Sequence, residues 1–404
     1  MQTALADFIR DTAAGRDADR ILRSCVHCGF CNATCPTYQV LGDELDGPRG
    51  RIYQIKQMLE GAPVSRATLT HLDRCLTCRN CETTCPSGVR YGELLEIGRA
   101  LAEQRIGRPW GGRALRSLLR AVIVHRWRFA LLLRTAQRLR RLLPRSLRRK
   151  VPAPARPGRW PPQRHARRML VLEGCVQPTL APDINAAAAR VLDSIGVSLI
   201  AASHAGCCGA ASLHTSGFEQ ARELARHNID CWEPLFDEGV EALVMTASGC
   251  GVHVKDYGHL LRDDPVYAPR AQRVAARTRD LVEVLLQEDV SVLASSAVPM
   301  RRVAFHSPCT LQHGQKLGGA VETVLRRAGF DVVPVREPHL CCGSAGTYSL
   351  LQPGIAQQLR RRKLGHLEAD HPEVIATANI GCLTHLAAEA RLPVRHWIEL
   401  IAPR

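Results

Sequence analysis

The stretch that decides the fold is Cys25-Val-His-Cys-Gly-Phe-Cys-Asn-Ala-Thr-Cys-Pro36, and its cysteine spacing returns between Cys75 and Pro86. Both runs read C-x2-C-x2-C-x3-C-P. Two-residue gaps let three thiolates surround one face of a cubane, and the fourth cysteine reaches out of that turn. Zinc ribbons use distant C-x2-C pairs, and disulfide frameworks belong to small secreted domains. The spacing therefore predicts two [4Fe–4S] clusters.

The two runs are expected to exchange one ligand each. In two-cluster ferredoxins with this spacing, the fourth cysteine of each run ligates the other cluster. One cluster is thus expected on Cys25, Cys28, Cys31 and Cys85, and the second on Cys75, Cys78, Cys81 and Cys35. Apolar residues recur at helical spacing between and after the runs. An all-α ferredoxin domain is therefore expected over residues 1–105.

Bulk composition limits the remaining choices. A chain of 404 residues with 46% hydrophobic content has room for two or three domains. Seventeen cysteines, an odd number, argue against a closed set of disulfides. The charged N-terminus predicts no secretory signal, and apolar runs are too short for a transmembrane helix. We expect a cytoplasmic protein, peripheral on the inner face of the cell membrane.

The positive charge lies in one segment. Between Glu103 and Glu173 there are 20 of the 54 Lys and Arg residues and no acidic residue. Residues 106–166 are predicted as a basic amphipathic helical connector ending in a Pro-rich linker. The connector can lie on an anionic membrane, dock an acidic partner, or pack its apolar face between domains. Nucleic-acid binding is disfavoured because aromatics make up only 4% of the chain.

The chain after residue 166 is an internal duplication. Cys175 aligns with Cys309, the pair Cys207–Cys208 with Cys341–Cys342, and Cys250 with Cys382. Both pairs continue into Gly, and both late cysteines are followed three residues on by a histidine. Two domains are therefore expected, over residues 167–298 and 299–404.

Each half is predicted to be an α/β domain. Three short apolar strands alternate with helices in each half, which favours a parallel sheet. The strands are expected at 169–172, 197–201 and 242–246, and at 303–305, 331–335 and 374–377. The cysteines then follow the carboxyl ends of strands, where ligands of open sheets collect. The fold class is α+β multidomain: an all-α two-[4Fe–4S] ferredoxin domain followed by two duplicated α/β domains.

The duplicated half resembles the Cys-Cys-Gly domain of heterodisulfide reductase B-type subunits. That resemblance implies a non-cubane iron–sulfur cluster held by a lone cysteine, the pair and a final C-x2-C. Here histidine replaces the last cysteine, and imidazole raises a cluster potential relative to thiolate. Altered clusters, remodelled sites and inert buried thiols all remain open. The candidate ligands of further clusters are Cys175, Cys207, Cys208, Cys250 and His253, then Cys309, Cys341, Cys342, Cys382 and His385.

The full chain resembles iron–sulfur subunits of flavin-linked dehydrogenases. The stretches that carry the likeness run from Ser24 to Tyr38, from Gly47 to Tyr53 (Gly-Pro-Arg-Gly-Arg-Ile-Tyr) and from Cys75 to Val89. They look closest to the glycolate oxidase iron–sulfur subunit family. The resemblance implies flavoprotein partner subunits that oxidise glycolate to glyoxylate, while this chain carries electrons to a quinone or another membrane acceptor.

Other functions compete with this interpretation. The iron–sulfur subunits of anaerobic glycerol-3-phosphate dehydrogenase and the lactate-utilisation proteins are similar in parts. A disulfide or quinone reductase acting at the Cys-Cys-Gly sites, and a cluster-bearing nucleic-acid-binding protein, are rivals from other classes. The chain has no G-x-G-x-x-G fingerprint and no P-loop. Clusters without an organic cofactor site favour electron transfer from a partner over catalysis in this chain.

Overall fold

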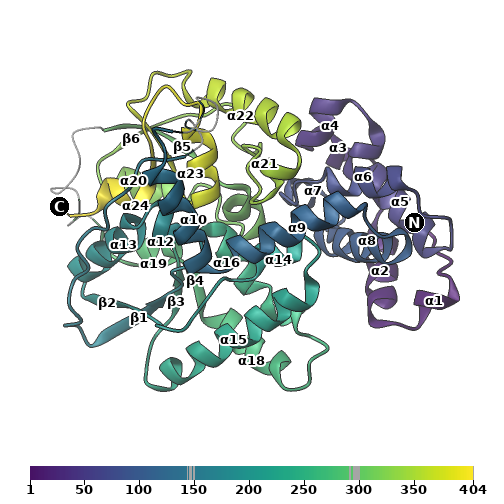
Figure 1. Cartoon of the computed structure of the whole chain (residues 1–404), viewed down its shortest axis with the longest axis horizontal. Helices are drawn as coiled ribbons and strands as arrows, with labels where there is room; N and C mark the ends of the chain where they lie inside the picture. Colours follow the sequence, from purple (N-terminus) through teal and green to yellow (C-terminus); the bar gives the residue numbers. More distant parts are fainter. Residues whose placement is uncertain (143, 145–147, 149–150, 291–292, 294–300, 404) are drawn as a thin grey trace.

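The N-terminal domain, residues 1–105, contains helices joined by loops and no strand. The computed structural model describes residues 1–404 except 143, 145–147, 149–150, 291–292, 294–300 and 404. The first domain lies at the opposite side of the molecule from the two sheets (Figure 1). Its elements are α1 (Asp7–Arg10), α2 (Ala13–Ser24), α3 (Phe30–Ala33), α4 (Pro36–Leu41), η1 (Glu44–Asp46), α5 (Pro48–Leu59), α6 (Arg66–Asp73), α7 (Asn80–Thr84) and α8 (Tyr91–Ile106).

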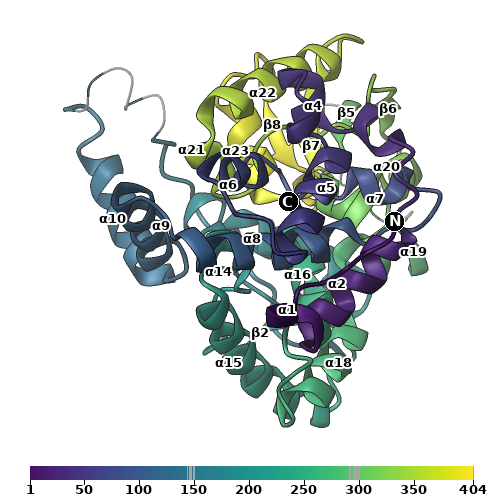
Figure 2. The ribbon, with the colours of Figure 1, turned by 90° about the vertical axis from the view of Figure 1, so that its right-hand side faces the viewer.

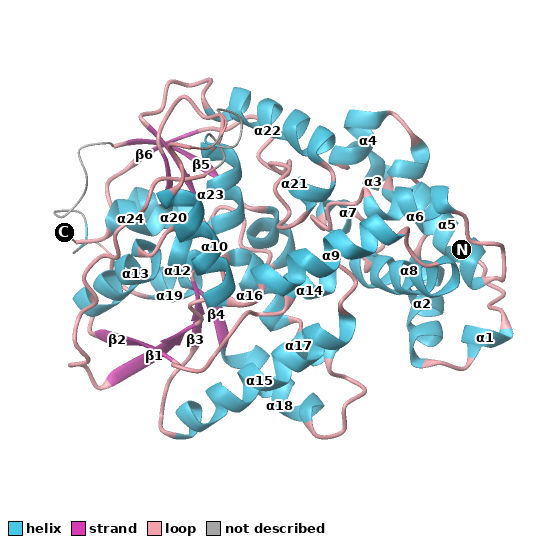
Figure 3. Cartoon of the chain, viewed as in Figure 1, coloured by secondary structure: helices cyan, strands magenta, loops and turns pink. Residues whose placement is uncertain are grey.

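Each repeat forms a four-stranded parallel sheet (Figure 3). The first sheet has the order β2-β1-β3-β4 and the second the order β6-β5-β7-β8. The strands are β1 (Arg167–Val171), β2 (Val197–Ala201), β3 (Leu243–Met245), β4 (Thr278–Asp280), β5 (Arg302–His306), β6 (Asp331–Val333), β7 (Val374–Thr377) and β8 (Val394–His396). The predicted fold class is confirmed, and all six predicted strands are present. The fourth strand of each sheet, only three residues long, was not predicted.

Helices surround both sheets. The first repeat contains α12 (Gln177–Leu180), α13 (Asp183–Ser194), α14 (Ala210–His214), α15 (Phe218–Asp237), α16 (Ser248–Lys255), α17 (Tyr257–Leu260), α18 (Tyr267–Arg277) and α19 (Leu281–Gln287). The second repeat contains η3 (Thr310–Gly314), α20 (Ala320–Arg327), α21 (Tyr348–Leu351), α22 (Pro353–Leu367), α23 (Ile380–Ala387) and α24 (Trp397–Ile401). In this strand order, the loops after the first and third strands diverge at a switch point, where open sheets bind ligands.

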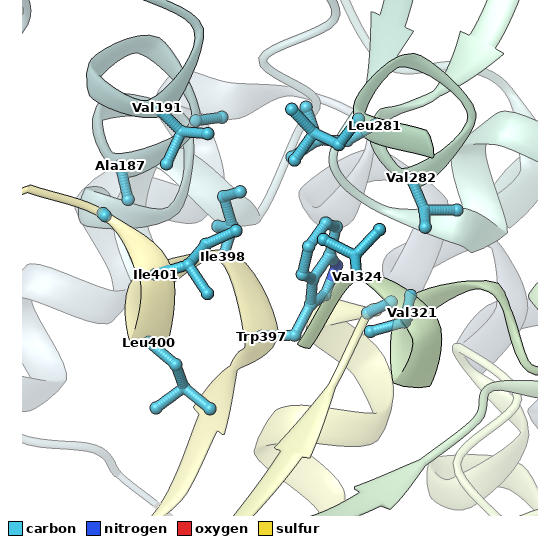
Figure 4. Close-up of a cluster of buried hydrophobic side chains, with 14 of the residues drawn as sticks. Ala187, Val191, Leu281, Val282, Val321, Val324, Trp397, Ile398, Leu400 and Ile401 are labelled. Atoms are coloured by element: carbon cyan, nitrogen blue, oxygen red, sulfur yellow. The ribbon is translucent and has the colours of Figure 1, made fainter. Parts of the chain in front are cut away.

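The two repeats share one hydrophobic core. Helix α24 of the second repeat packs on α13 of the first, and α19 of the first repeat packs on α20 of the second. Trp397 lies at the centre of this cluster, close to Leu281, Val282 and Val324 (Figure 4). These two helix contacts bury apolar surface from both repeats. Burial of apolar surface stabilises a fold by roughly 25 cal/mol per Å². The two sheets are therefore held as one unit.

The connector forms a helical hairpin. Helices α9 (Trp110–Ile123) and α10 (Arg126–Arg138) project to one side of the body (Figure 2). The buried residue of α9 is Arg116, whose guanidinium lies 2.9 Å from the Asp73 carboxylate. Trp110 is 82% exposed and Trp127 65% exposed. The hairpin thus buries one arginine, whereas both tryptophans and other arginines, among them Arg126 with its side chain 52% exposed, face the solvent. No helix in the described part of the chain is long and apolar enough to cross a membrane.

Candidate functional site

A cavity near the surface of the helical domain is lined by five cysteines, of which Cys81 also lines a second cavity. The other four are Cys25, Cys28, Cys31 and Cys85, the set expected for the first cluster. His27 and Gly29 adopt positive φ angles of 58° and 90°, which turn the chain between the first three thiols. Burial and the neighbouring Cys25 thiolate raise the pKa of Cys31 to about 11. Iron binds thiolates, so loading this site releases protons.

A second cavity adjoins the first. It is lined by Cys35, Cys75, Cys78 and Cys81, the set expected for the second cluster. Cys81, Pro48 and Tyr91 line both cavities and form the wall between them. The fourth cysteine of each run therefore lies at the cavity of the other run. Burial raises the pKa of Cys78 and Cys81 well above the usual thiol range.

A buried ionic network supports the segment between the two runs. Asp46 is fully buried, with its Oδ1 3.3 Å from the Arg51 guanidinium and its Oδ2 2.8 Å from Arg74. The ring of His71 lies 3.1 Å from the same carboxylate. Arg51 belongs to the Gly47–Tyr53 stretch and also donates to Thr37 Oγ1 at 3.2 Å. The network joins the start of α4 to η1, α5 and α6, so it fixes the walls of the second cavity.

The second cavity faces the second repeat. Cys78 packs against an apolar cluster that contains Cys309, Cys341 and Tyr348. After burial, the neighbouring Cys309 thiolate is the main cause that raises the Cys78 pKa. Asn80 Nδ2 donates to the His339 carbonyl at 3.2 Å across the same contact. The predicted second cluster and the second Cys-Cys-Gly site therefore adjoin.

The first Cys-Cys-Gly site lies beyond the carboxyl ends of β1, β2 and β3. Cys175 contacts Cys207, and Cys208 contacts Cys250, so the four thiols form one chain of hydrogen-bonding neighbours. The Nε2 atom of His253 is buried without a hydrogen-bond partner among the described residues. It lies 3.3 Å from the place that a Cβ on Gly209 would occupy. All five predicted residues of this site thus converge.

Two side chains donate hydrogen bonds to the backbone carbonyls of the cysteine pair in the first site. Tyr257 Oη donates to the Cys208 carbonyl at 2.6 Å, and Asn228 Nδ2 donates to the Cys207 carbonyl at 2.9 Å. Gly209 has a φ of 98°, a conformation that favours glycine. The pair is therefore presented on a turn that only glycine closes without strain.

The second Cys-Cys-Gly site has the same layout on β5, β6 and β7. Cys309 Sγ lies 3.9 Å from Cys341 Sγ, and Cys342 contacts Cys382. Gly343 donates its backbone N–H to Cys341 Sγ at 3.4 Å. A Cβ on Gly343 would lie 2.5 Å from the Ala356 carbonyl oxygen, so no other residue fits. Amide hydrogen bonds to sulfur favour the thiolate that iron requires.

His385, the predicted histidine of the second site, differs from His253 because its Nε2 has a hydrogen-bond partner. His385 Nε2 lies 3.3 Å from the Ala356 carbonyl oxygen. A different histidine, His306 at the end of β5, lies with Cys342 and Cys382 instead. Buried Lys363 also lies nearby, and its Nζ donates to the carbonyls of Glu337 and Pro338 at 2.8 and 3.2 Å. Sequence reasoning missed both residues, although His306 stands three residues before Cys309 and could have been noticed.

Two family models match the stretches of the chain that hold these sites. The model of a 4Fe-4S dicluster domain matches residues 21–89, and that of a cysteine-rich domain matches residues 169–255 and 303–387. The fold and sites together define an iron–sulfur protein that combines a two-cluster ferredoxin domain with tandem cysteine-rich domains. The donor sets fit iron–sulfur clusters, because four thiols with ferredoxin spacing converge on each cavity.

Relatives of the whole chain narrow the class further. The glycolate oxidase iron-sulfur subunit of Escherichia coli (strain K12) is 55% identical in an alignment of 404 positions that covers 99% of this chain and 98% of that protein. The probable glycolate oxidase iron-sulfur subunit of Bacillus subtilis (strain 168) is 30% identical over 90% of this chain and 88% of its own. Lactate utilization protein A of an Exiguobacterium strain is 27% identical over 52% of this chain and 85% of its own. The chain belongs to the family of glycolate oxidase iron–sulfur subunits.

Proposed function

We propose that this chain is the electron-transfer subunit of a flavin-dependent glycolate dehydrogenase complex. Flavoprotein partner subunits would oxidise glycolate to glyoxylate, and the chain would pass the electrons towards a membrane quinone or another acceptor. The likeness to two glycolate oxidase iron-sulfur subunits over most of their lengths supports this choice of substrate. The chain would bind no substrate itself and act as an electron carrier.

The order of the cysteine sites in space is the observation that carries the proposal. The first cavity opens beside the exposed Cys28, shares the wall residue Cys81 with the second cavity, and the second cavity reaches Cys309 through Cys78. Three sites in contact make a path from the surface to the interior. We propose that electrons follow it from the first cubane to the second and then to the second Cys-Cys-Gly site.

The assigned ligands follow the two cavities. The first [4Fe–4S] cluster would take Cys25, Cys28, Cys31 and Cys85, and the second would take Cys75, Cys78, Cys81 and Cys35. Further iron–sulfur clusters would occupy the Cys-Cys-Gly sites. The functional units would be the ferredoxin domain (1–105), the connector (106–166) and the two Cys-Cys-Gly domains (167–298 and 299–404).

The entry point for electrons would be the apolar rim of the first cavity. Val26 is 69% exposed and Phe30 63% exposed, and both line that cavity. Exposed apolar residues at the mouth of a redox site mark a docking surface for a protein partner. We place the flavoprotein there, because its electrons would reach the first cluster without crossing the rest of the chain.

The α9–α10 hairpin would hold the protein at the inner face of the membrane. Tryptophan and leucine side chains are exposed along it, and arginines lie between them. They are Trp110, Leu118, Trp127, Leu131 and Leu132. Such a surface binds anionic bilayers through buried apolar area and cationic side chains together. An interfacial location would bring the chain close to a quinone pool.

Anaerobic reduction of the purified complex by substrate tests the proposal. The tagged full chain, isolated with its partner subunits, should lose visible cluster absorbance on addition of glycolate. Bleaching by lactate or glycerol 3-phosphate but not by glycolate would assign the chain to a different dehydrogenase. The double variant Val26→Asp, Phe30→Asp should slow bleaching at least tenfold. The matched control Leu350→Asp, at a residue 59% exposed elsewhere, should leave the rate unchanged.

A further inference from the structure

His306 is a buried histidine whose ring forms no hydrogen bond with the described residues. It is the last residue of β5 and 1% exposed. Neither its Nδ1 nor its Nε2 has a hydrogen-bond partner among the described residues. Leaving a buried polar group unsatisfied costs about 1–3 kcal/mol. Because both ring nitrogens of His306 lack a hydrogen-bond partner, we expect the imidazole to bind a ligand.

The side chains around His306 supply the rest of a metal site. Ligand atoms of His306, Cys342 and Cys382 all lie within 4.8 Å of one another, and all three residues are buried. His306 ends β5 and Cys382 follows β7, so the two flank the switch point of the second sheet. Cys341 precedes Cys342 and lies 3.9 Å from Cys309, which brings the remaining thiols to the same place.

The two repeats differ at this position. Leu172 stands three residues before Cys175 in the first repeat, where His306 stands before Cys309 in the second. In the first repeat the unpartnered imidazole at the cysteines is that of His253, whereas its counterpart His385 turns its Nε2 to the Ala356 carbonyl. Among the described residues, each site therefore has a buried imidazole nitrogen without a hydrogen-bond partner, but the histidine comes from a different element in each repeat.

We propose that His306, not His385, is the imidazole ligand of an iron centre in the second Cys-Cys-Gly domain, completing the thiolate set of Cys309, Cys341, Cys342 and Cys382. The inference rests on the proposed presence of iron–sulfur clusters at these sites. Iron–sulfur centres accept imidazole in place of thiolate, with a higher reduction potential. A mixed centre at the end of the cubane path would draw electrons away from the low-potential cubanes.

The surroundings suit such a centre. Asn379 Nδ2 lies 3.7 Å from Cys382 Sγ, and the Gly343 N–H lies 3.4 Å from Cys341 Sγ, so two sulfurs already receive donors. Lys363 is 2% exposed and brings a buried cation to the same thiols. Donors and positive charge around a cluster stabilise its reduced form.

Pulsed EPR on the anaerobically purified full chain tests the ligand. The chain is labelled with 15N-histidine, reduced stepwise, and the nitrogen coupling of each paramagnetic species is measured together with iron per chain. Wild type should contain more than about eight irons. One species should show a directly bound histidine nitrogen that disappears in His306→Ala and persists in His385→Ala. His306→Cys should restore iron without that nitrogen coupling and with a lower potential.

The outcomes distinguish a wrong assignment of His306 as ligand from the absence of the proposed cluster. Loss of the coupling in His385→Ala, with retention in His306→Ala, would overturn the assignment of His306 and leave the cluster intact. Wild type with extra iron but no nitrogen coupling that responds to His306 would overturn it equally. Only about eight irons, all in two cubanes, would instead remove the cluster on which the inference rests. Circular dichroism of each variant shows whether lost coupling reflects lost folding.

Discussion

The Tyr348 hydroxyl donates a 2.9 Å hydrogen bond to the backbone carbonyl of Arg74, the residue just before the second cluster run. Tyr348 also packs in the apolar cluster that holds Cys309, Cys341 and Leu76. One side chain therefore touches both the ferredoxin run and the second Cys-Cys-Gly site. The contact joins two cysteine sites that lie far apart in the sequence.

Truncation of Tyr348 should loosen this contact. Tyr348→Ala removes a buried aromatic ring, which costs about 3–5 kcal/mol, whereas Tyr348→Phe removes one hydrogen bond worth about 1 kcal/mol. Hydrogen exchange of α7 and η3 should accelerate strongly in the alanine variant and slightly in the phenylalanine variant. Equal protection in all three proteins would show that the two sites are held together elsewhere.

Removal of Asp46 should destabilise the ferredoxin domain. Asp46→Ala leaves the fully buried Arg51 guanidinium without its carboxylate, and breaking such a pair typically costs about 3–5 kcal/mol. We expect faster loss of cluster absorbance on mild heating. Asp7→Ala is the matched control, because the Asp7 side chain is 92% exposed beside Arg10 and exposed pairs contribute little. Similar cluster lifetimes in both variants would contradict a structural role for the network.

Charged substitutions on the connector should abolish membrane binding. In Trp127→Asp, Leu131→Asp two apolar side chains that are 65% and 60% exposed become anionic, which opposes insertion and attraction to anionic lipid. Cosedimentation with phosphatidylserine-containing vesicles should fall at least tenfold. Val266→Asp, at a residue 60% exposed on the first repeat, serves as the control. Wild-type sedimentation of the double variant would exclude the hairpin as the membrane contact.

Acid should weaken the interface between the repeats through His396. This residue is fully buried, its Nε2 lies 2.8 Å from the Thr246 carbonyl, and burial lowers its pKa from 6.5 to about 4. Because the unfolded state binds the proton first, stability is complete above about pH 6.5 and falls towards pH 4, by roughly 2–3 kcal/mol. Hydrogen exchange of α24, corrected for intrinsic rates, should show this loss. In His396→Gln the pH-dependent loss should be smaller, and an unchanged slope would contradict the assignment.

Removal of the buried cation should lower the potential of the second Cys-Cys-Gly centre. Lys363→Met deletes a buried positive charge that interacts with the thiols of Cys341, Cys342 and Cys382. Two unit charges about 8 Å apart interact by about 2 kcal/mol when the effective dielectric constant is near 20. A fall of roughly 50–100 mV in midpoint potential is therefore expected for a one-electron couple. Arg361→Met, on the same helix with its side chain 69% exposed, should shift the potential far less. Equal shifts would show that Lys363 is not near the centre.

The sequence predicted the sheets because alternation of apolar strands with helices is a local pattern. It missed β4 and β8, because three residues such as Thr-Arg-Asp carry no alternation. A signal was nevertheless present: Asp280 with Glu283, and His396 with Glu399, form capping boxes that begin α19 and α24. Each of these short helices packs against a helix of the other repeat. That packing depends on tertiary structure and not on a local sequence pattern.

Candidate ligands were predictable only where spacing is characteristic. The eight ferredoxin cysteines converge on two cavities as their spacing implies. The placement of His306 beside Cys342 and Cys382 depends on how β5 and β7 pair, which one sequence does not reveal. Lys363 is hidden for a similar reason, because it sits among arginines in a helix whose pattern looks solvent-exposed.

Freeze-quench EPR of the anaerobic complex tests the central claim, that the second Cys-Cys-Gly site lies between the second cubane and the external acceptor. Glycolate is mixed with the complex, and a short-chain quinone is added after the cubanes are reduced. In Cys342→Ser, both cubanes should be reduced at the wild-type rate, but their reoxidation by quinone should slow at least a hundredfold. Reoxidation at the wild-type rate, with both cubanes intact and the second site empty of iron, would contradict the account.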